Sequence, residues 1–243
     1  MVRVVKIYLI YFIILLSCVA CTKREEKLIM VTEASFAPYE YYSDGKIVGV
    51  DVDIAKEIAK ELGRELVVKD VAFDSIIHEV KSGKADIGIA GISYNSERAK
   101  QVDFSVNYTI SKQVVIVRND SRIGDILNIK DKKIAVQLGS IADLYVSENY
   151  SSKNIVRQKK YLAAIQDLKD RKVDCVVMDE LPAKQILIQN NDIKILNEPL
   201  LEDSYGIIVN KGNVELLEVV NGVINKLKSE GKIDEFLIEH SSN

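Results

Sequence analysis

The chain has 243 residues, of which 47% are hydrophobic and 28% charged, and its formal net charge is -3. This composition is ordinary for a globular protein with one or two sizeable cores, which excludes a disordered chain. The 33 lysine and arginine residues are spread along the sequence and form no basic block, which argues against a nucleic-acid partner.

The N-terminus predicts an export signal. Arg3 and Lys6 precede an apolar run over residues 7–16. This run is shorter than the about 20 residues that a membrane-spanning helix needs, so we interpret it as a signal and not as a span.

The cysteines that end this region resemble those of a bacterial lipoprotein signal, in which one cysteine becomes lipid-modified and forms the new N-terminus. We expect Cys21 to be that residue, with Cys18 as the alternative. Residues 1–21 are then the signal peptide and residues 22–27 a tether. An ordinary cleaved signal without a lipid is the other possibility.

The remaining cysteine and the histidines exclude several kinds of site. Beyond the signal only Cys175 is left, so the mature chain has no partner for an intramolecular disulfide. His78 and His240 stand alone, without the spacing of metal ligands. We therefore expect no metal, no cofactor and no histidine-based catalytic triad.

Strands and helices alternate from residue 27 onward. The sequence predicts strands over residues 27–32, 65–73 and 85–92, and helices over residues 52–63 and 74–83. The first helix shows an apolar face of helical period and ends at a glycine. Such alternation is typical of mostly parallel sheets covered by helices, so the predicted fold class is α/β.

A short internal repeat divides the chain. Residues 73–86 match residues 161–174 without a gap, and an apolar strand follows each copy. The aligned pairs are Phe73 with Tyr161, Ile77 with Ile165, Val80 with Leu168, Lys84 with Lys172 and Asp86 with Asp174. We interpret the two copies as parts of two similar lobes.

The lobe boundaries follow from two strand-like segments that start near residues 113 and 204 and are suited to cross between the lobes. The first lobe is predicted to comprise residues 28–112 and 206–243, and the second lobe residues 113–205. Two apolar-faced helices near the C-terminus would return to cover the first lobe. Two lobes joined by a two-strand hinge enclose a cleft, and clefts between lobes bind small ligands.

Arg98 is the most informative single residue. It lies in the first turn of a short helix that Asn95 or Ser96 can cap, where a cation opposes the helix dipole at a cost of about 0.3–1 kcal/mol. If the preceding strand ends at the cleft, the guanidinium can bind a carboxylate through two parallel hydrogen bonds. The alternative is a solvated arginine that pairs with Glu97 or Asp103.

Five segments carry a family resemblance, in order and at similar spacings. They read TEASFAPYEY, GKIVGVDVDIAKEIAKELG, FDSIIHEVKSGKADIGIAGISYNSERAKQVDFS, IAVQLGS and VDCVVMDE. They resemble the polar amino-acid-binding proteins of ABC importers, which have the type II periplasmic-binding-protein fold. The resemblance covers residues 27–240 and implies two lobes, each with a mostly parallel sheet flanked by helices, joined by a two-strand hinge.

The resemblance assigns the carboxylate end of an amino-acid ligand. Arg98 matches the family arginine that holds the ligand α-carboxylate, and the backbone around Gly139 and Ser140, at a helix start, would donate N–H groups to it. Ile141 stands where many relatives have a threonine, so one side-chain hydrogen bond is expected to be absent.

The ammonium end falls at the end of a predicted strand of the second lobe. Asp179 matches the acid that receives the α-ammonium, and Ser93 and the backbone of Gly91 would add a hydroxyl and a carbonyl. Gly91 occupies a position that relatives often fill with serine.

The side-chain end is predicted from three further matches. Phe36 and Phe73 match the aromatic residues that enclose the ligand side chain, and Glu33 matches an acid that meets the distal cation in relatives that bind lysine or arginine. Relatives that take glutamine also carry an acid there. For Phe36 and Phe73, plain core packing is the alternative.

These residues predict a monomeric, lipid-anchored receptor in the bacterial periplasm or on the outer face of the cell membrane. It would capture an L-amino acid, arginine or lysine foremost, by closure of the lobes, and deliver it to an ABC permease without being an enzyme. One alternative is an exported enzyme similar to cyclohexadienyl dehydratase, with Glu33 and Glu180 as candidate acids. The other is a sensory ligand-binding lipoprotein.

Overall fold

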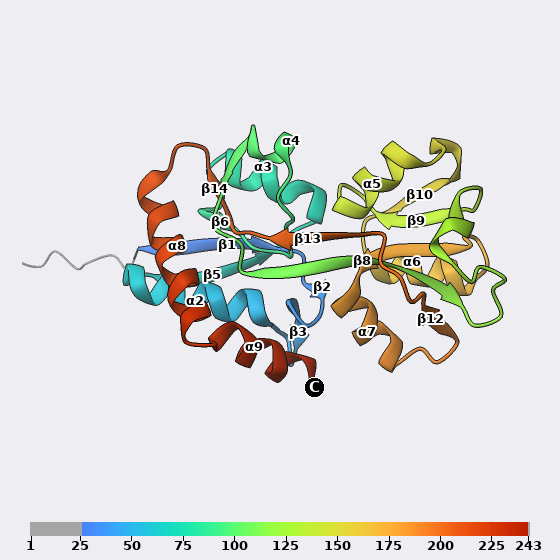
Figure 1. The fold of residues 1–243 in the computed structure, drawn as a ribbon. Helices are drawn as coiled ribbons and strands as arrows, with labels where there is room; N and C mark the ends of the chain where they lie inside the picture. Colours follow the sequence, from blue (N-terminus) through green and yellow to red (C-terminus); the bar gives the residue numbers. More distant parts are fainter. Residues whose placement is uncertain (1–25, 243) are drawn as a thin grey trace, which may run out of the picture.

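The structure is a computed structural model of the chain that describes residues 26–242 (Figure 1). The expected signal peptide, with Cys18 and Cys21, and residues 22–25 of the expected tether lie outside the described residues.

The fold is the predicted α/β fold with two lobes side by side (Figure 1). The sheet of the first lobe has the spatial order β5 (Glu65–Asp70), β1 (Lys27–Thr32), β6 (Ile87–Gly88), β14 (Ile208–Asn210) and β7 (Val102–Phe104). The strands β5, β1 and β6 are parallel, and β14 is antiparallel to both β6 and β7. The parallel part corresponds to the alternation of strands and helices in the sequence.

The first-lobe sheet is covered on both faces by helices. These are α2 (Val50–Leu62), the 3-10 turn η1 (Phe73–Ser75), α3 (Ile76–Lys81), α4 (Ser96–Ala99), α8 (Val214–Ser229) and α9 (Lys232–Ser241). Side chains alternate along β1, so Leu28 and Met30 pack in the core with α2 and α8, while Val31 packs with α3 on the other face. The helices after β14 therefore return to the first lobe, as predicted.

The second-lobe sheet is built around a long strand. Its order is β10 (Ile155–Gln158), β9 (Ile134–Gln137), β11 (Cys175–Asp179), β8 (Thr109–Arg118) and β12 (Ile193–Ile195), and β13 (Leu201–Tyr205) also pairs with β8. The strands β10, β9 and β11 are parallel, and β8 is antiparallel to β11. The helices of this lobe are η2 (Ile126–Ile129), α5 (Ile141–Asn149), η3 (Ser152–Asn154), α6 (Tyr161–Lys169) and α7 (Glu180–Ile188).

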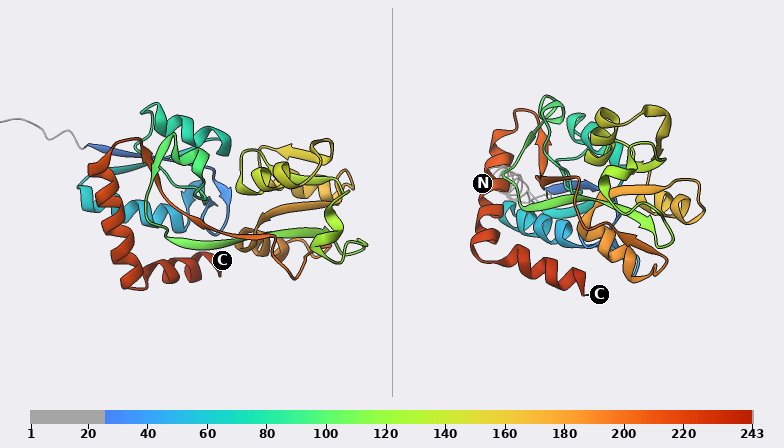
Figure 2. Two further views of the ribbon diagram at one scale, coloured as in Figure 1. Left: turned by 45° about the horizontal axis from the view of Figure 1, so that its top comes forward. Right: turned by 45° about the vertical axis from the view of Figure 1, so that its right-hand side comes forward.

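Two strands link the lobes. The chain leaves the first lobe along β8 and returns along β13, and the two views of Figure 2 show both strands running between the lobes. The strands form an antiparallel ladder in which Ser111 lies opposite Asp203 and Thr109 lies opposite Tyr205. The boundaries expected at 112/113 and 205/206 fall within this ladder and at its end, and they stay predictions.

Two strands are shorter than the sequence predicts. The strand expected over residues 85–92 is only β6 (Ile87–Gly88), because the backbone turns at Gly91, where φ is 53°. The strand expected over residues 65–73 ends at Asp70, and Phe73 begins η1. After each shortened strand the chain leaves the sheet, and the residues that follow, Phe73 and Gly91, line the cavity described below.

A small sheet flanks the cleft on the first lobe. It consists of β2 (Ser35–Phe36), β3 (Glu40–Ser43) and β4 (Lys46–Val48) in a meander. It carries the aromatic turn between β1 and α2, so Phe36 and Glu40 are held in place by strand pairing. No helix within residues 26–242 is long and apolar enough to cross a membrane.

Candidate functional site

A small cavity lies between the lobes and collects the predicted residues. Eight of the nine predicted ligand-binding residues line it: Glu33, Phe36, Phe73, Gly91, Ser93, Ser140, Ile141 and Asp179. The ninth, Arg98, donates a hydrogen bond to the carbonyl of one of these lining residues, Ser93. The centre of a water-sized sphere can occupy about 10 Å³ between these side chains, which is room for about one water molecule. Their roles in ligand binding stay predictions, but the fold brings them together.

The lining residues reach the cavity from the ends of strands and the starts of helices. Glu33 follows β1 and Asp179 ends β11, while Ser140 immediately precedes α5. The carboxyl ends of parallel strands point to a common edge of a sheet, and the two lobes turn these edges toward each other. Residues far apart in the sequence are thereby brought to one cavity.

Arg98 is a buried cation that spans the two lobes. Its side chain comes from α4, where Asn95 Oδ1 accepts a hydrogen bond from Arg98 N at 2.9 Å, so Asn95 is the cap. Nη1 donates to the Ser93 carbonyl at 2.6 Å, and Nη2 donates to the Gly139 carbonyl of the second lobe at 2.8 Å. Burial lowers the pKa of Arg98 to about 10, opposed by the charges of Asp203 and Asp179, so the guanidinium stays charged at neutral pH.

The guanidinium has capacity for a further partner. A guanidinium carries five N–H donors, and these two hydrogen bonds use two of them. Its carbon lies 5.7 Å from the ring centroid of Phe73, so the aromatic face supports the cation. The solvated pairing of Arg98 with Glu97 or Asp103 is not what the structure shows, because Glu97 pairs with Lys100 and Asp103 pairs with Lys211.

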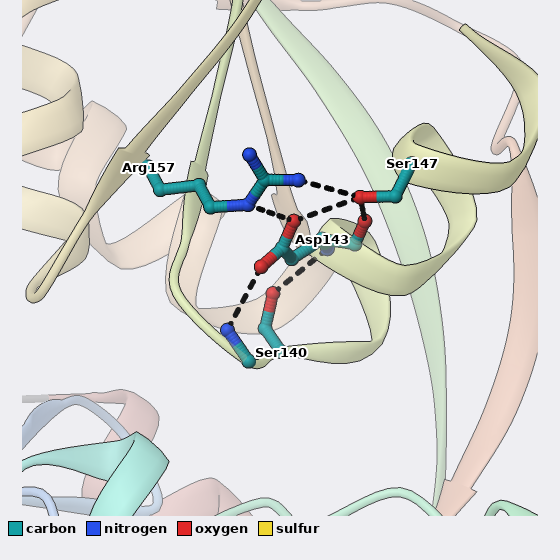
Figure 3. Close-up of polar contacts among 5 residues, drawn as sticks. Ser140, Asp143, Ser147 and Arg157 are labelled. Atoms are coloured by element: carbon teal, nitrogen blue, oxygen red, sulfur yellow. Dashed lines mark hydrogen bonds and ion pairs between the residues drawn. The ribbon is translucent and has the colours of Figure 1, made fainter. Parts of the chain in front are cut away.

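The turn at Gly139 and Ser140 is fixed by the carboxylate of Asp143 (Figure 3). Gly139 N donates to Asp143 Oδ2 at 3.0 Å, and Ser140 Oγ accepts from Asp143 N at 3.1 Å. Arg157 Nε donates to Asp143 Oδ1 at 2.8 Å and holds the carboxylate from β10. These bonds cap α5 and orient its first turn toward Arg98.

The two backbone N–H groups predicted to bind the ligand carboxylate, those of Gly139 and Ser140, already have hydrogen-bond partners in the structure. The N–H of Gly139 is used inside the turn, and the N–H of Ser140 donates to the Gln137 carbonyl at 3.2 Å. The N–H groups that an α-helix leaves without a partner of its own belong to its first turn, which here starts at Ile141. The N–H groups at the start of α5, in place of those of Gly139 and Ser140, are therefore the ones suited to an anion, and this role stays a prediction.

Asp179 is a buried acid held by three donors. Its side chain is 5% exposed, and Oδ1 accepts from Ser111 Oγ at 2.8 Å and from Gln113 Nε2 at 2.6 Å. The hydroxyl of Tyr205 donates to the same oxygen. Burial, and after it the charge of Asp203, raise the pKa of Asp179 to about 7 against the opposing effect of the three hydrogen bonds.

The structure shows a steric reason for glycine at position 91, which the sequence did not reveal. Its φ is 53°, and an added Cβ would lie 2.8 Å from Phe36 Cε1 and 3.2 Å from Tyr205 Cε2. Gly91 N donates to Asp51 Oδ2 at 3.0 Å. Glycine at this position therefore permits a close approach of the aromatic rings that a Cβ would prevent.

Glu33 already lies beside a cation. Its side chain is 2% exposed, and Oε1 lies 3.2 Å from Nζ of Lys160 of the second lobe. Gln137 Nε2, also of the second lobe, donates to Glu33 Oε2 at 3.2 Å, and Ser35 Oγ donates to Oε1 at 2.6 Å. Glu33 thus forms contacts across the cleft with Lys160 and Gln137 of the second lobe.

Aromatic rings form the wall between the two ends. Phe36 stacks on Tyr161 of the second lobe, with centroids 5.7 Å apart and an interplanar angle of 22°, and on Tyr39 with centroids 5.9 Å apart. Phe73 is half-buried and faces Arg98. Tyr161, aligned with Phe73 in the internal repeat, thus places a second-lobe ring in the cavity.

Glu40 is a further buried acid that the sequence analysis missed. It lines the cavity, and burial raises its pKa well above the usual range, as does the neighbouring carboxyl of Asp51. Burial also raises the pKa of Asp51, which Gly91 N and the Glu40 side chain oppose. Of these two acids, Asp51 contacts the Gly91 turn, through the hydrogen bond from Gly91 N.

The sequence comparisons identify the family. The family described as bacterial extracellular solute-binding proteins, family 3, matches residues 28–240. The chain belongs to this family. The solute-binding protein is a substrate-binding protein and not an enzyme. Glu180, the second acid of the enzyme hypothesis, pairs with Lys184 at 2.6 Å and does not line the cavity.

Three similar proteins are informative. The arginine-binding extracellular protein ArtP of Bacillus subtilis is 30% identical over 215 residues, covering 86% of this chain and 84% of ArtP. AbpA of Streptococcus pneumoniae, solved bound to L-arginine, is 35% identical with a TM-score of 0.85, covering 90% of this chain and 96% of that chain. An ancestral arginine-binding protein, solved bound to glutamine, is 38% identical with a TM-score of 0.82, covering 88% and 97%.

Four residues of the cavity were absent from the prediction: Glu40, Ala90, Gln137 and Tyr161. The repeat contained a signal for Tyr161, because its partner Phe73 was assigned to the site and the two positions align. Gln137 ends β9 immediately before the glycine turn, a position equivalent to a strand end at the cleft. Lys160 carries no such signal, because its contact with Glu33 depends on how the lobes close.

Proposed function

We propose that this solute-binding protein captures an L-amino acid between its lobes and delivers it to an ABC permease. The observation that carries the proposal is a pair of opposite buried charges at one cavity. Arg98 of the first lobe suits an α-carboxylate, and Asp179 of the second lobe suits an α-ammonium. A ligand with both groups at one carbon can contact both lobes at once.

Ligand binding and lobe closure are then one equilibrium. The cavity has room for about one water molecule, so the lobes or their side chains must separate to admit an amino acid. The ligand carboxylate would take the position between Arg98 and the start of α5, where Arg98 now donates to the Gly139 carbonyl. A ligand favours the closed form only through contacts that it makes better there, and a bridging zwitterion makes such contacts.

We infer that the favoured ligand is basic, arginine or lysine. Glu33 is buried and holds the Lys160 ammonium at 3.2 Å, so this end of the cleft suits a cation. The rings of Phe36, Phe73 and Tyr161 provide faces on which a guanidinium or an aliphatic chain can stack. A distal cation of the ligand would compete with Lys160 for Glu33, whereas glutamine would leave that pair intact.

We further propose that the chain acts as a monomer tethered outside the bacterial membrane by a lipid on Cys21 or Cys18. The support is the sequence of residues 1–21 and the extracellular character of the family. Mass spectrometry of the mature N-terminus, with cell fractionation of Cys21→Ser and Cys18→Ser variants, tests this part. A soluble product from only one of the variants would identify the modified cysteine.

A thermal-melt screen of the purified full chain against the common L-amino acids, followed by calorimetry, tests the main proposal. A ligand at 100 times its dissociation constant stabilises a protein by about 2.7 kcal/mol, which shifts the melting temperature of a chain of this size by several degrees. A shift with arginine or lysine alone supports the basic preference, and a shift with glutamine contradicts it while keeping the receptor function. No shift with any amino acid contradicts the proposal.

A further inference from the structure

We propose that Asp203 of the hinge strand β13 is a second carboxyl group of the ammonium subsite, and that binding of the ligand ammonium releases a proton which Asp179 and Asp203 hold between them. This inference rests on the proposed function, because it concerns the ammonium of the same ligand. It gives a role to a half-buried acid that neither the sequence nor the resemblance singled out.

The β8–β13 ladder places the two carboxyl groups close together. Asp203 lies directly opposite Ser111, and side chains of opposed residues share one face of a sheet with Cβ atoms about 5 Å apart. Ser111 Oγ donates to Asp179 Oδ1 at 2.8 Å. The hydroxyl group of Ser111, the residue opposite Asp203, therefore contacts Asp179.

The serine of the predicted amine site connects Asp203 to the cavity. Ser93 lines the cavity, and its hydroxyl donates to Asp203 Oδ2. A hydroxyl that donates in one direction can still accept in another, so Ser93 can receive a hydrogen bond from an ammonium while it holds Asp203. An ammonium at this position would lie between Ser93 and Asp179, within reach of the Asp203 charge.

Two buried acceptor atoms without a donor indicate where the retained proton lies. Asp203 Oδ1 and Gln113 Oε1 are both buried and have no hydrogen-bond donor within the described residues 26–242. The side chain of Gln113 acts on Asp203 and donates through Nε2 to Asp179, so Gln113 links the two carboxyl groups. A proton on Asp203 would supply the missing donor, since buried acceptors without a donor are costly.

The charges that face the pair favour one retained proton. Arg98 is the cation that acts on both carboxyls, and it directs two hydrogen bonds to the main-chain carbonyls of Ser93 and Gly139. Within residues 26–242, the acids and phenols that interact with Asp179 include Tyr39, Glu40, Tyr161 and Tyr205. Burial raises the pKa of Asp179 to about 7 and raises the pKa of Asp203, although Ser93, Gln113 and Arg98 oppose the latter.

An arriving ammonium replaces this proton. The ligand brings three N–H donors and a positive charge, so both carboxyl groups can be ionised in the complex. The carboxylic O–H bond then breaks, the electron pair stays on the carboxylate and the proton passes to solvent. Binding is favoured at higher pH, because below the pKa the proton competes with the ligand, and affinity should fall about tenfold between pH 8 and pH 6.

Calorimetry of the full chain with L-arginine tests this linkage, with L-glutamine as the probe if the screen selects a neutral ligand. Phosphate and Tris have different ionisation enthalpies, so the difference between the binding heats measured in these two buffers at pH 7 gives the number of protons released. We expect about half a proton per ligand for a group whose pKa is about 7. The Asp203→Asn variant should release fewer protons and show a flatter affinity between pH 6 and pH 8. Glu202→Gln is the matched control, because Glu202 is the exposed neighbour on the same strand, opposite Lys112.

The outcomes separate this inference from the function on which it rests. Binding without proton release, at constant affinity from pH 6 to pH 8, overturns the inference and leaves the receptor function intact. Equal changes in Glu202→Gln and Asp203→Asn also overturn it. Undiminished proton release in Asp203→Asn overturns it too, because the proton would then come from another group, and His78 and His240 are unchanged in both variants. If no amino acid binds, both proposals fail. Asp203→Ser replaces Asp203→Asn if the latter does not fold.

Discussion

The segments 73–86 of the first lobe and 161–174 of the second each run from an aromatic residue at the cleft, through a helix, to an aspartate before the next strand. At the far end the hydrogen bonds correspond. Asp86 and Ile29 exchange two bonds, of 2.9 Å between Asp86 N and Ile29 O and 2.7 Å between Ile29 N and Asp86 Oδ2. Asp174 and Lys133 exchange the same two bonds at 2.8 and 2.9 Å. The aspartate ties the helix to the neighbouring strand in both lobes.

The cleft ends of the two segments differ. Phe73 is half-buried in a 3-10 turn and faces the guanidinium of Arg98. Tyr161 is buried at the start of α6 and stacks on Phe36 of the other lobe. The repeat thus sets where an aromatic ring enters the cavity, while the partners from outside the repeat decide whether that ring supports a cation or packs against the opposite lobe.

The largest effect expected from this difference is on stability. Tyr161→Ala removes a fully packed ring and should lower the free energy of unfolding by about 3 kcal/mol, whereas Phe73→Ala, at a half-buried ring, should cost about 1 kcal/mol. Urea denaturation measures both. Tyr161→Phe, which keeps the ring, is the control, and equal losses at the two positions would show that the rings are packed alike.

Removing the charge that each lobe contributes should abolish most of the binding. Arg98→Ala and Asp179→Ala should each weaken amino-acid binding by at least about 2 kcal/mol, or about 30-fold, because one charge of the ligand would be buried without a partner. Calorimetry with the ligand found by screening measures this loss. Glu180→Gln, beside Asp179 but outside the cavity, is the control. Near-normal affinity in either alanine variant would remove that residue from the site.

The aspartates at the far ends should matter in proportion to burial. Asp86→Ala should cost about 1 kcal/mol of unfolding free energy, and Asp174→Ala about 0.5 kcal/mol, because the bond to Ile29 is partly buried and the bond to Lys133 is exposed. Denaturation of each variant is compared with its asparagine counterpart, which keeps one acceptor oxygen. A larger loss for Asp174→Ala would contradict this ranking.

The smallest effect should appear in selectivity. Lys160 immediately precedes the second copy, where the first copy has Ala72, and this added cation pairs with Glu33. Lys160→Met should raise the affinity for arginine relative to glutamine by about fivefold, a modest change because the Lys160 side chain is 48% exposed. Competition calorimetry measures the ratio, with Lys159→Met as the control. An unchanged ratio would show that the pair does not compete with the ligand.

Local patterns predicted the scaffold well because they act within one element. The strand over residues 27–32 and the stop of α2 at Gly63 are confirmed, since alternation and a left-handed glycine are properties of the segment itself. The strand predicted over residues 85–92 was too long. Its apolar letters continue past Gly88, but the positive φ of Gly91 turns the chain into the cleft.

The site was predicted only where the resemblance supplied a role. The structure places Asp179 and Glu33 in the lining of one cavity and Arg98 against the lining residue Ser93, while their roles in binding stay predictions. The contacts of Glu33 with Gln137 and Lys160 could not be predicted, because they join lobes whose closure no local pattern describes. The buried acids Glu40, in β3, and Asp51, in the first turn of α2, were missed for a similar reason: acids are expected in water until tertiary packing covers them.

The ladder of β8 and β13 carries Ser111, Gln113 and Tyr205, all of which donate to Asp179. A fluorescent sensor that reports lobe closure in this chain could be adjusted at two places, the strands that link the lobes and the cleft. In this protein those two settings are not independent. If Asp179 receives the ligand ammonium as proposed, a substitution on the linking strands would change both how easily the lobes bend and how firmly the ligand is held, so the signal of such a sensor should be adjusted at exposed positions of the lobes.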